Sequence, residues 1–305
     1  MSEDLGKDRL SARIRELAKE RHAVILAHNY QAGQVQDVSD FVGDSLELSQ
    51  KAAAVTEDVI VFCGVHFMAE TASVLSPQKV VLIPDPHAGC PMADMITAAE
   101  LIAWKSRYPG RPVVCYVNTS ADVKAECDVC CTSSNAVRVV ESVPGAEVLF
   151  APDKNLAAYV ARTSRKRIIP WDGYCYVHNN ILARDIRDKK KAHPAAVVWA
   201  HPECRPEVLD LADKVLSTGQ MIKEARTGEA REVIIATESG VLHRLRKDNP
   251  GKVFHPAHDL AFCANMKKIT LKKVALALEH MTHRVQVPPE VADRARGAIE
   301  KMVKL

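Results

Sequence analysis

The chain has 305 residues, of which 47% are hydrophobic and 26% charged, so length and composition predict a globular protein of about two domains or three small ones. A formal net charge of +3, with no basic block interleaved with aromatic residues, argues against a nucleic-acid-binding protein. No apolar run approaches the ~20 residues that span a bilayer, and residues 1–22 are too charged for a secretory signal. We therefore expect a cytoplasmic protein without a membrane segment.

The chain opens with a predicted amphipathic helix, because Leu10, Ile14 and Leu17 recur at helical spacing. An apolar run at 23–27 then predicts a strand buried on both faces. This strand stops at His28, Asn29 and Tyr30, three side chains that form hydrogen bonds. Residues of this kind indicate that the strand ends at a wet site rather than in the core.

The same pattern of a strand with a polar end occurs three times, at 24–30, 113–118 and 197–203. His28 and Tyr116 are 88 residues apart, and Tyr116 and His201 are 85 residues apart. The polar residues at alternating positions of these ends are His28, Tyr30, Tyr116, Asn118, His201 and Glu203. The chain therefore has an internal repeat of about 86 residues.

Three further features keep the same spacing. Strand, turn and helix patterns recur at 59–75, 147–162 and 232–247. A hydroxyl precedes a helical pattern at Ser45, Ser133 and Thr218, which is typical of a helix N-cap. Each repeat then closes on a cysteine, and the cysteine positions, 85 and 88 residues apart, are Cys90, Cys175 and Cys263.

Alternation of strands and helices predicts an α/β protein of three αβα domains, each with a small parallel sheet. Such sheets bind ligands at the carboxyl ends of their strands, where the polar residues of this chain lie. We expect the domains to surround one central active site with pseudo-threefold symmetry. The predicted segments are an N-terminal helix (1–21), three α/β repeats (22–110, 111–194 and 195–287) and a C-terminal helix (288–305).

Three thiolates at one point would suit an iron–sulfur cluster with one open iron, or a Cys₃ zinc site. Glycines near Cys90 and Cys175 favour close approach of the backbone to something bulky. The alternative is that all three cysteines are small buried apolar residues.

Cys127 and Cys130 form a C-x-x-C, half of a possible zinc site, but the sequence has no second C-x-x-C. We therefore interpret these two and the adjacent Cys131 as structural cysteines or incidental redox groups. A disulfide framework is not expected in a cytoplasmic chain of this size.

Hydroxyls at three helix N-termini can bind carboxylate or phosphate groups, or can simply cap the helices. The sequence does not distinguish Ser133 from Ser134 as the inward hydroxyl. Glu203 shares a strand face with His201 and can supply acid–base chemistry with Tyr30 and His28, or can lie in an exposed turn. Glu70 can face either solvent or the site.

Motifs from residue 27 to residue 271 together resemble the quinolinate synthase family of bacterial and archaeal NAD biosynthesis. They are AHNYQ, GDSLELS, CGVHFMAETA, AGCPMADM, YVNTSADVKAE, CTSSNA, DGYCYVH, HPEC, STGQM, ATESGVLHRLRKDNPGKVF and NMKKITL. The resemblance implies a [4Fe–4S] cluster on Cys90, Cys175 and Cys263 with one iron open. It also implies that iminoaspartate condenses with dihydroxyacetone phosphate to give quinolinate, phosphate and two waters.

The resemblance also suggests roles for the predicted residues. The catalytic candidates are Tyr30, Tyr116, His201 and Glu203, with Tyr30 and Glu203 moving protons. Three of these, Tyr116, His201 and Glu203, are also substrate-binding candidates. The other substrate-binding candidates are His28, Ser45, Asn118, Ser133, His178 and Thr218. The labile iminoaspartate implies a closing cavity that excludes water, and coupling to an L-aspartate oxidase or dehydrogenase that supplies it.

Two alternative functions remain open from the sequence. Another cluster-dependent dehydratase or reductase could use the same three thiolates. A metal or redox sensor would instead use Cys127, Cys130 and Cys131, and would leave the repeated His, Tyr and Glu residues unexplained.

Overall fold

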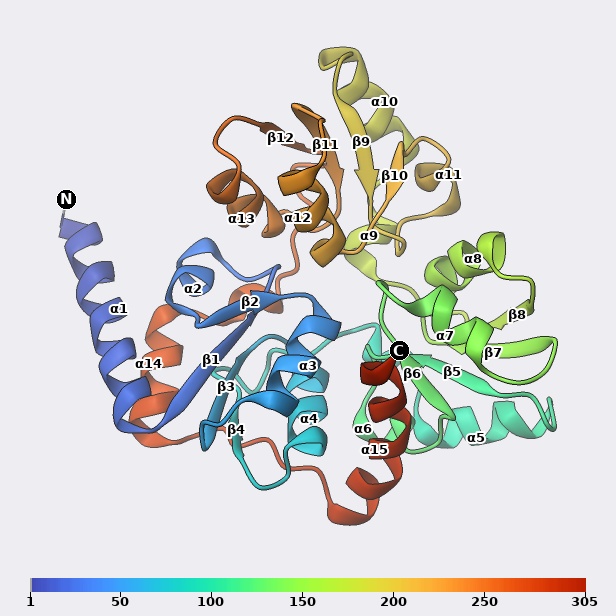
Figure 1. The fold of residues 1–305 in the computed structure, drawn as a ribbon, viewed down its shortest axis with the longest axis horizontal. Coiled ribbons are helices and arrows are strands. Elements are labelled where there is room, and N and C mark those ends of the chain that lie inside the picture. Colours follow the sequence, from blue (N-terminus) through green and yellow to red (C-terminus); the bar gives the residue numbers. More distant parts are fainter. Residues whose placement is uncertain (1) are drawn as a thin grey trace.

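The computed structural model describes residues 2–305 and contains three four-stranded parallel sheets arranged around a common centre (Figure 1). The strand orders are β2-β1-β3-β4, β6-β5-β7-β8 and β10-β9-β11-β12, so one topology is repeated three times. The predicted α/β class with three small parallel sheets is confirmed. The short strands β2, β6 and β10 at one edge of each sheet were not predicted.

The first unit is drawn in blue and cyan in Figure 1, with α1 on one side of its sheet and α3 and α4 on the other. Its elements are α1 (Ser2–Glu20), β1 (Ala23–His28), α2 (Gly33–Val38), β2 (Phe41–Gly43), α3 (Ser45–Ala54), β3 (Val59–Cys63), α4 (His66–Leu75), β4 (Val80–Leu82) and the 3-10 turn η1 (Ala93–Met95).

The second unit is green in Figure 1 and repeats this order. Its elements are α5 (Ala98–Ser106), β5 (Val113–Tyr116), α6 (Ala121–Lys124), β6 (Val129–Cys131), α7 (Ala136–Ser142), β7 (Glu147–Ala151), α8 (Lys154–Thr163) and β8 (Arg167–Pro170).

The third unit is yellow to orange in Figure 1. Its elements are α9 (Tyr176–Asn179), α10 (Ala183–Ala192), β9 (Val197–Ala200), α11 (Pro206–Leu209), β10 (Lys214–Val215), α12 (Thr218–Thr227), β11 (Glu232–Ala236), α13 (Val241–Asp248), β12 (Val253–Pro256) and the 3-10 turn η2 (Met266–Lys268). The chain ends with α14 (Leu271–His280) and α15 (Pro289–Lys304).

Each sheet is buried on both faces, which explains its nearly continuous apolar strands. In the third sheet, Val198 and Ile234 pack toward α10, whereas Trp199, Val233 and Ile235 pack toward α12 and α13. This alternation follows from the two-residue period of a strand. The helices α1, α5 and α10 each pack on the sheet that follows them in the chain. The division of the chain into the five predicted segments remains a prediction.

Two C-terminal helices return to earlier parts of the fold. Helix α14 packs against α1, and α15 lies between the first and second units, in contact with α4, α6 and β6 (Figure 1). Asn135 Nδ2 donates a hydrogen bond to the carbonyl oxygen of Met302 over 3.1 Å and fixes the end of α15. Among residues 2–305, every helix falls short of the length and apolar content needed to cross a bilayer.

We predict that Ile299→Ala destabilises the protein, because Ile299 on α15 is fully buried between the first two units. Removing such a side chain costs about 2–5 kcal/mol of unfolding free energy. Urea unfolding followed by circular dichroism measures the loss. Ile102→Ala is the matched control, since Ile102 is 50% exposed and should change stability by at most about 0.5 kcal/mol. Equal losses in the two variants would contradict the packing role of α15.

Candidate active site

All thirteen predicted site residues line one cavity where the three units meet. The cavity has a volume of about 70 Å³, which is room for a few water molecules. Its lining from the predicted set consists of His28, Tyr30, Ser45, Cys90, Tyr116, Asn118, Ser133, Cys175, His178, His201, Glu203, Thr218 and Cys263. The carboxyl ends of β1, β5 and β9 supply His28, Tyr116 and, one residue past β9, His201.

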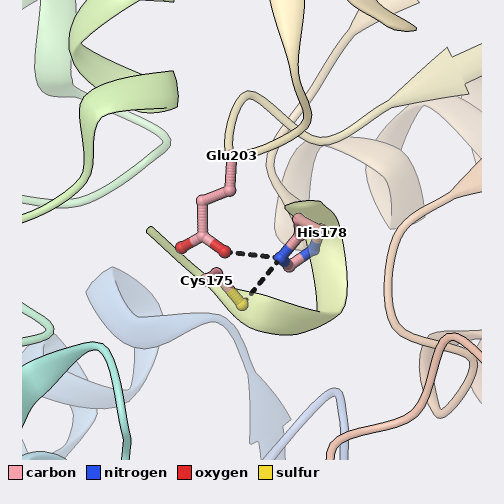
Figure 2. Close-up of side chains that lie close together, drawn as sticks. All are labelled: Cys175, His178 and Glu203. Atoms are coloured by element: carbon pink, nitrogen blue, oxygen red, sulfur yellow. Dashed lines mark hydrogen bonds and ion pairs between the residues drawn. The ribbon is translucent and has the colours of Figure 1, made fainter. Parts of the chain in front are cut away.

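Glu203 is the centre of the hydrogen-bond network in this cavity and is 3% exposed. The Tyr116 hydroxyl donates to Glu203 Oε1 over 2.5 Å, so the second and third units meet at this pair. Glu203 Oε2 lies 2.6 Å from His178 Nδ1, as Figure 2 shows. The His178 ring also stacks on His201, with ring centroids 4.6 Å apart.

Burial and neighbouring side chains give these groups different protonation states. Burial alone would raise the pKa of Glu203, but His178, His201 and the Tyr116 hydroxyl outweigh it and hold the pKa below its ordinary value. Burial lowers the pKa of His201 to about 3 and that of His28 to about 3, although Glu203 opposes both shifts. The cavity at neutral pH therefore holds an ionised carboxylate beside two neutral imidazoles.

Tyr30 connects the first unit to the third. Its hydroxyl lies 2.6 Å from Thr237 Oγ1 and 3.3 Å from His178 Nε2. Burial and then the charge of Glu203 raise the pKa of Tyr30 well above its ordinary value, so the hydroxyl keeps its proton. His178 Nε2 in turn lies 2.7 Å from Thr237 Oγ1, which makes a continuous chain of proton-bearing groups from Tyr30 to Glu203.

The expectation that Ser45 and Thr218 cap their helices is wrong. Asp44 is the N-cap of α3 and accepts hydrogen bonds from the Leu46 and Glu47 amides, while Ser217 is the N-cap of α12. Ser45 and Thr218 are the first helical residues, and both line the cavity. Ser133 lines it from the turn before α7, whose N-cap is Asn135. Ser134 does not line this cavity.

Asn118 carries a polar atom that lacks a partner. Its Oδ1 is buried and accepts no hydrogen bond from residues 2–305, although the residue lines the cavity. An unpaired buried oxygen costs free energy unless a ligand or water pairs with it. A polar ligand in the cavity would satisfy this atom.

The three phased cysteines line the cavity on separate loops after β4, β8 and β12. Burial raises the pKa of Cys90 to about 12 and that of Cys175 well above its ordinary value. Smaller contributions come from Cys263 acting on Cys90 and from Cys90 acting on Cys175, so the thiols lie within electrostatic range of each other. Within residues 2–305, the three thiols do not form a group whose ligand atoms all lie within 4.8 Å, although Cys175 forms one with His178 and Glu203.

Two buried carboxylates that hold the cysteine loops were missed by the sequence analysis. Asp153 Oδ2 accepts a hydrogen bond from the Cys175 amide over 3.2 Å, and Glu238 Oε1 accepts one from the Cys263 amide over 2.9 Å. Both carboxylates follow the third strand of their unit, 85 residues apart. Aligning the repeats would have paired them. The equivalent position of the first unit holds Val65.

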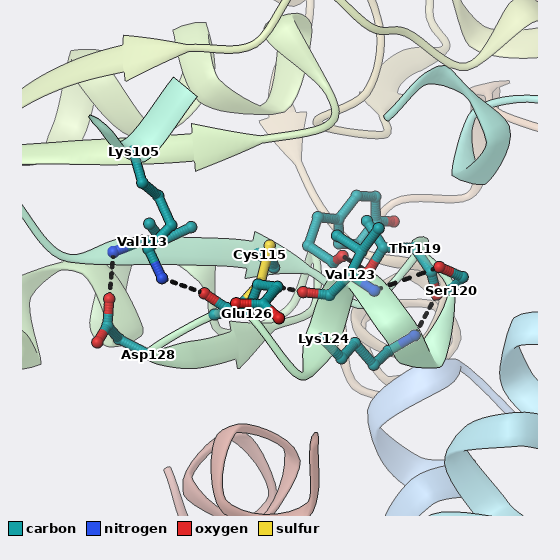
Figure 3. The surroundings of a disulfide bond; sticks show 11 residues. Lys105, Val113, Cys115, Thr119, Ser120, Val123, Lys124, Glu126 and Asp128 are labelled. Carbon is teal, nitrogen blue, oxygen red and sulfur yellow. Dashed lines mark hydrogen bonds between the residues drawn. A yellow bond between two sulfur atoms is a disulfide. The ribbon is translucent and has the colours of Figure 1, made fainter. Parts of the chain in front are cut away.

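Cys115 and Cys127 form a disulfide, which was not predicted (Figure 3). In the β5–β6 ladder, Cys130 pairs with Cys115. The C-x-x-C segment therefore lies next to β5, and its first cysteine, Cys127, bonds to Cys115 rather than facing a metal. Cys130 and Cys131 are buried free thiols in β6. The interpretation of these cysteines as structural agrees with their positions, whereas the disulfide itself was not expected.

Glu70 does not line the cavity. Its side chain accepts a hydrogen bond from the Ala121 amide over 3.1 Å and so connects α4 to α6. The structure thus gives Glu70 a position between the first and second units, which is neither of the two expected surroundings.

The chain is similar in sequence to known proteins of one family. Residues 12–304 match the family described as "Quinolinate synthetase A protein". The chain is 58% identical to a quinolinate synthase of Dehalococcoides mccartyi (strain CBDB1) over 98% of this chain and 99% of the relative. It is 53% identical to a quinolinate synthase of Methanoregula boonei over 97% and 98%, and 52% identical to one of Thermodesulfovibrio yellowstonii over 96% and 97%.

Proposed function

The chain belongs to the quinolinate synthase family and is an enzyme, and from that premise we propose that its cavity condenses iminoaspartate with dihydroxyacetone phosphate. The products are quinolinate, phosphate and two waters, which balance the atoms of the two substrates. The observation that carries the proposal is that the thirteen predicted residues, which lie in three separate repeats, line one cavity. Both substrates are anionic and carry several oxygens, which can pair with the polar side chains of the lining.

We propose that Cys90, Cys175 and Cys263 hold a [4Fe–4S] cluster with one open iron. The donor set fits this group, because three thiols from three loops line one cavity yet are spread more widely than the ligands of a single ion. A Cys₃ zinc site would need the three sulfurs closer together. When bound, the cluster supplies a Lewis acid at its open iron.

The anionic groups of the substrates would bind at the hydroxyls and helix N-termini. Ser45 and Thr218 begin α3 and α12, where the helix dipole favours negative charge, while Asp44 and Ser217 already accept hydrogen bonds from other amides of the first turns. Ser133 adds a hydroxyl from the second unit, and Asn118 offers its unpaired oxygen to a donor on the substrate. The neutral His28 and His201 can donate hydrogen bonds to substrate oxygens from opposite units.

Proton transfer would centre on Glu203 and Tyr30. Glu203 is ionised and can accept a proton from the substrate, and Tyr116 orients it through the 2.5 Å hydrogen bond. Tyr30 is protonated and can donate through the chain that Thr237 and His178 complete. These two groups can therefore move protons in a ketose-to-aldose shift.

We predict that Glu203→Gln slows quinolinate formation by about 10²–10⁴-fold, because glutamine keeps the shape but cannot accept the proton. The assay measures quinolinate by chromatography under anaerobic conditions, with iron per chain determined on the same sample. Glu207→Gln is the matched control, because the Glu207 side chain is 53% exposed on α11. Normal turnover by an iron-replete Glu203→Gln protein would remove Glu203 from the mechanism.

We also predict that Glu238→Gln loses iron faster than the natural protein. Glu238 Oε1 accepts from the Cys263 amide and from Lys267, while Oε2 accepts from the Gly240 amide over 2.7 Å. Glutamine has one acceptor oxygen for these donors, so the loop that carries Cys263 is less constrained. Positioning groups of this kind are worth about 10–100-fold in metal affinity.

Release of iron to a chelator and the electron paramagnetic resonance spectrum of the reduced protein report on this effect, whereas overall stability alone does not. Asp153→Asn should act similarly through Cys175, and Glu207→Gln should not. Iron release from Glu238→Gln at the rate of the Glu207→Gln control would show that the carboxylate does not position the thiol.

A further inference from the structure

A second cluster of metal-binding side chains lies in the third unit, outside the cavity. His193 Nδ1 and His255 Nε2 lie 3.0 Å and 2.9 Å from the same oxygen, Oε1 of Glu232. None of the three residues lines the cavity. We propose that His193, Glu232 and His255 form a binding site for one Zn²⁺ ion.

The fold brings these residues together in a definite way. Glu232 is the first residue of β11, His255 belongs to β12, and the β11–β12 ladder pairs Ile234 with His255. Glu232 and Ile234 are two residues apart and so share one sheet face, on which α10 packs. His193 is the C-cap of α10 and reaches the same place from that helix. The site therefore depends on two neighbouring strands and the helix that covers them.

The distances fit a zinc ion with little movement. All three ligand atoms lie within 4.8 Å of one another. Two ligands on a tetrahedral Zn²⁺ at 2.0–2.2 Å are about 3.4 Å apart, so each nitrogen needs to move from Glu232 by only a few tenths of an ångström. The two imidazole rings are stacked, with centroids 3.7 Å apart, so a ring must turn for both nitrogens to point at one ion.

The donor set selects the kind of ion. Two imidazoles and one carboxylate suit Zn²⁺ and related transition ions, whereas Mg²⁺ and Ca²⁺ prefer oxygen ligands. Within residues 2–305, His193 Nε2 and His255 Nδ1 have no hydrogen-bond partner in the protein, so each ring can hold its proton on the nitrogen that is not a ligand. The side chains are 20–32% exposed, which leaves a fourth position for water.

Calorimetric titration of the cluster-loaded protein with ZnCl₂ tests the proposal. We expect one Zn²⁺ per chain, unaffected by excess Mg²⁺. His193→Asn, Glu232→Gln and His255→Asn should each weaken the binding at least about tenfold, with iron per chain unchanged, since even outer groups are worth that much. His22→Asn is the matched control, because His22 pairs with a carboxylate, Asp58, at 2.9 Å but outside any such three-residue group.

X-ray absorption at the zinc edge distinguishes this site from the cysteines. Nitrogen and oxygen neighbours without sulfur are expected. Three results would each overturn the proposal. They are sulfur neighbours at the zinc, zinc binding that the three substitutions leave unchanged, and zinc binding that is no tighter in the His22→Asn control than in the three variants.

Discussion

The structure depends on one arrangement, in which the carboxyl ends of the strands of three sheets meet at one cavity. In a parallel sheet all strands end on the same side, and that side carries exposed amides and helix N-termini that favour polar ligands. Here three sheets of identical strand order bring their first strands to one cavity, so each unit contributes one imidazole or phenol from a strand end and one thiol from a later loop. No single unit supplies all the residues that line the cavity.

Electrostatics inside this cavity follow from burial. A buried carboxylate is costly unless it is paired, and Glu203 is paired with Tyr116 and His178 from two different parts of the chain. The same burial keeps His28 and His201 neutral. The carboxylate thus remains a base, while the imidazoles remain hydrogen-bonding groups that add no charge.

Much of this was predictable because the repeat places equivalent residues at equal spacing. His28, Tyr116 and His201 could be found from the sequence since each follows an apolar strand. Asp153 and Glu238 were missed because each bonds to a backbone amide of a later loop, which leaves no local pattern, and only their 85-residue spacing marks them as equivalent. The caps Asp44 and Ser217 were displaced by one residue from the hydroxyls predicted, because helix boundaries are uncertain by a residue or two from sequence. The Cys115–Cys127 disulfide depends on pairing between β5 and β6, and β6 is too short to predict.

We propose that three thiols, one from each unit, hold one cluster at the shared cavity. An anaerobic count of iron and acid-labile sulfide, with an absorbance spectrum, measures this directly. We expect about four of each per chain, lost on changing Cys90, Cys175 or Cys263 to alanine and kept in a Cys130→Ala protein, whose thiol is buried in β6 outside the cavity. Full iron and sulfide in the three alanine variants, or their loss only in Cys130→Ala, would contradict it.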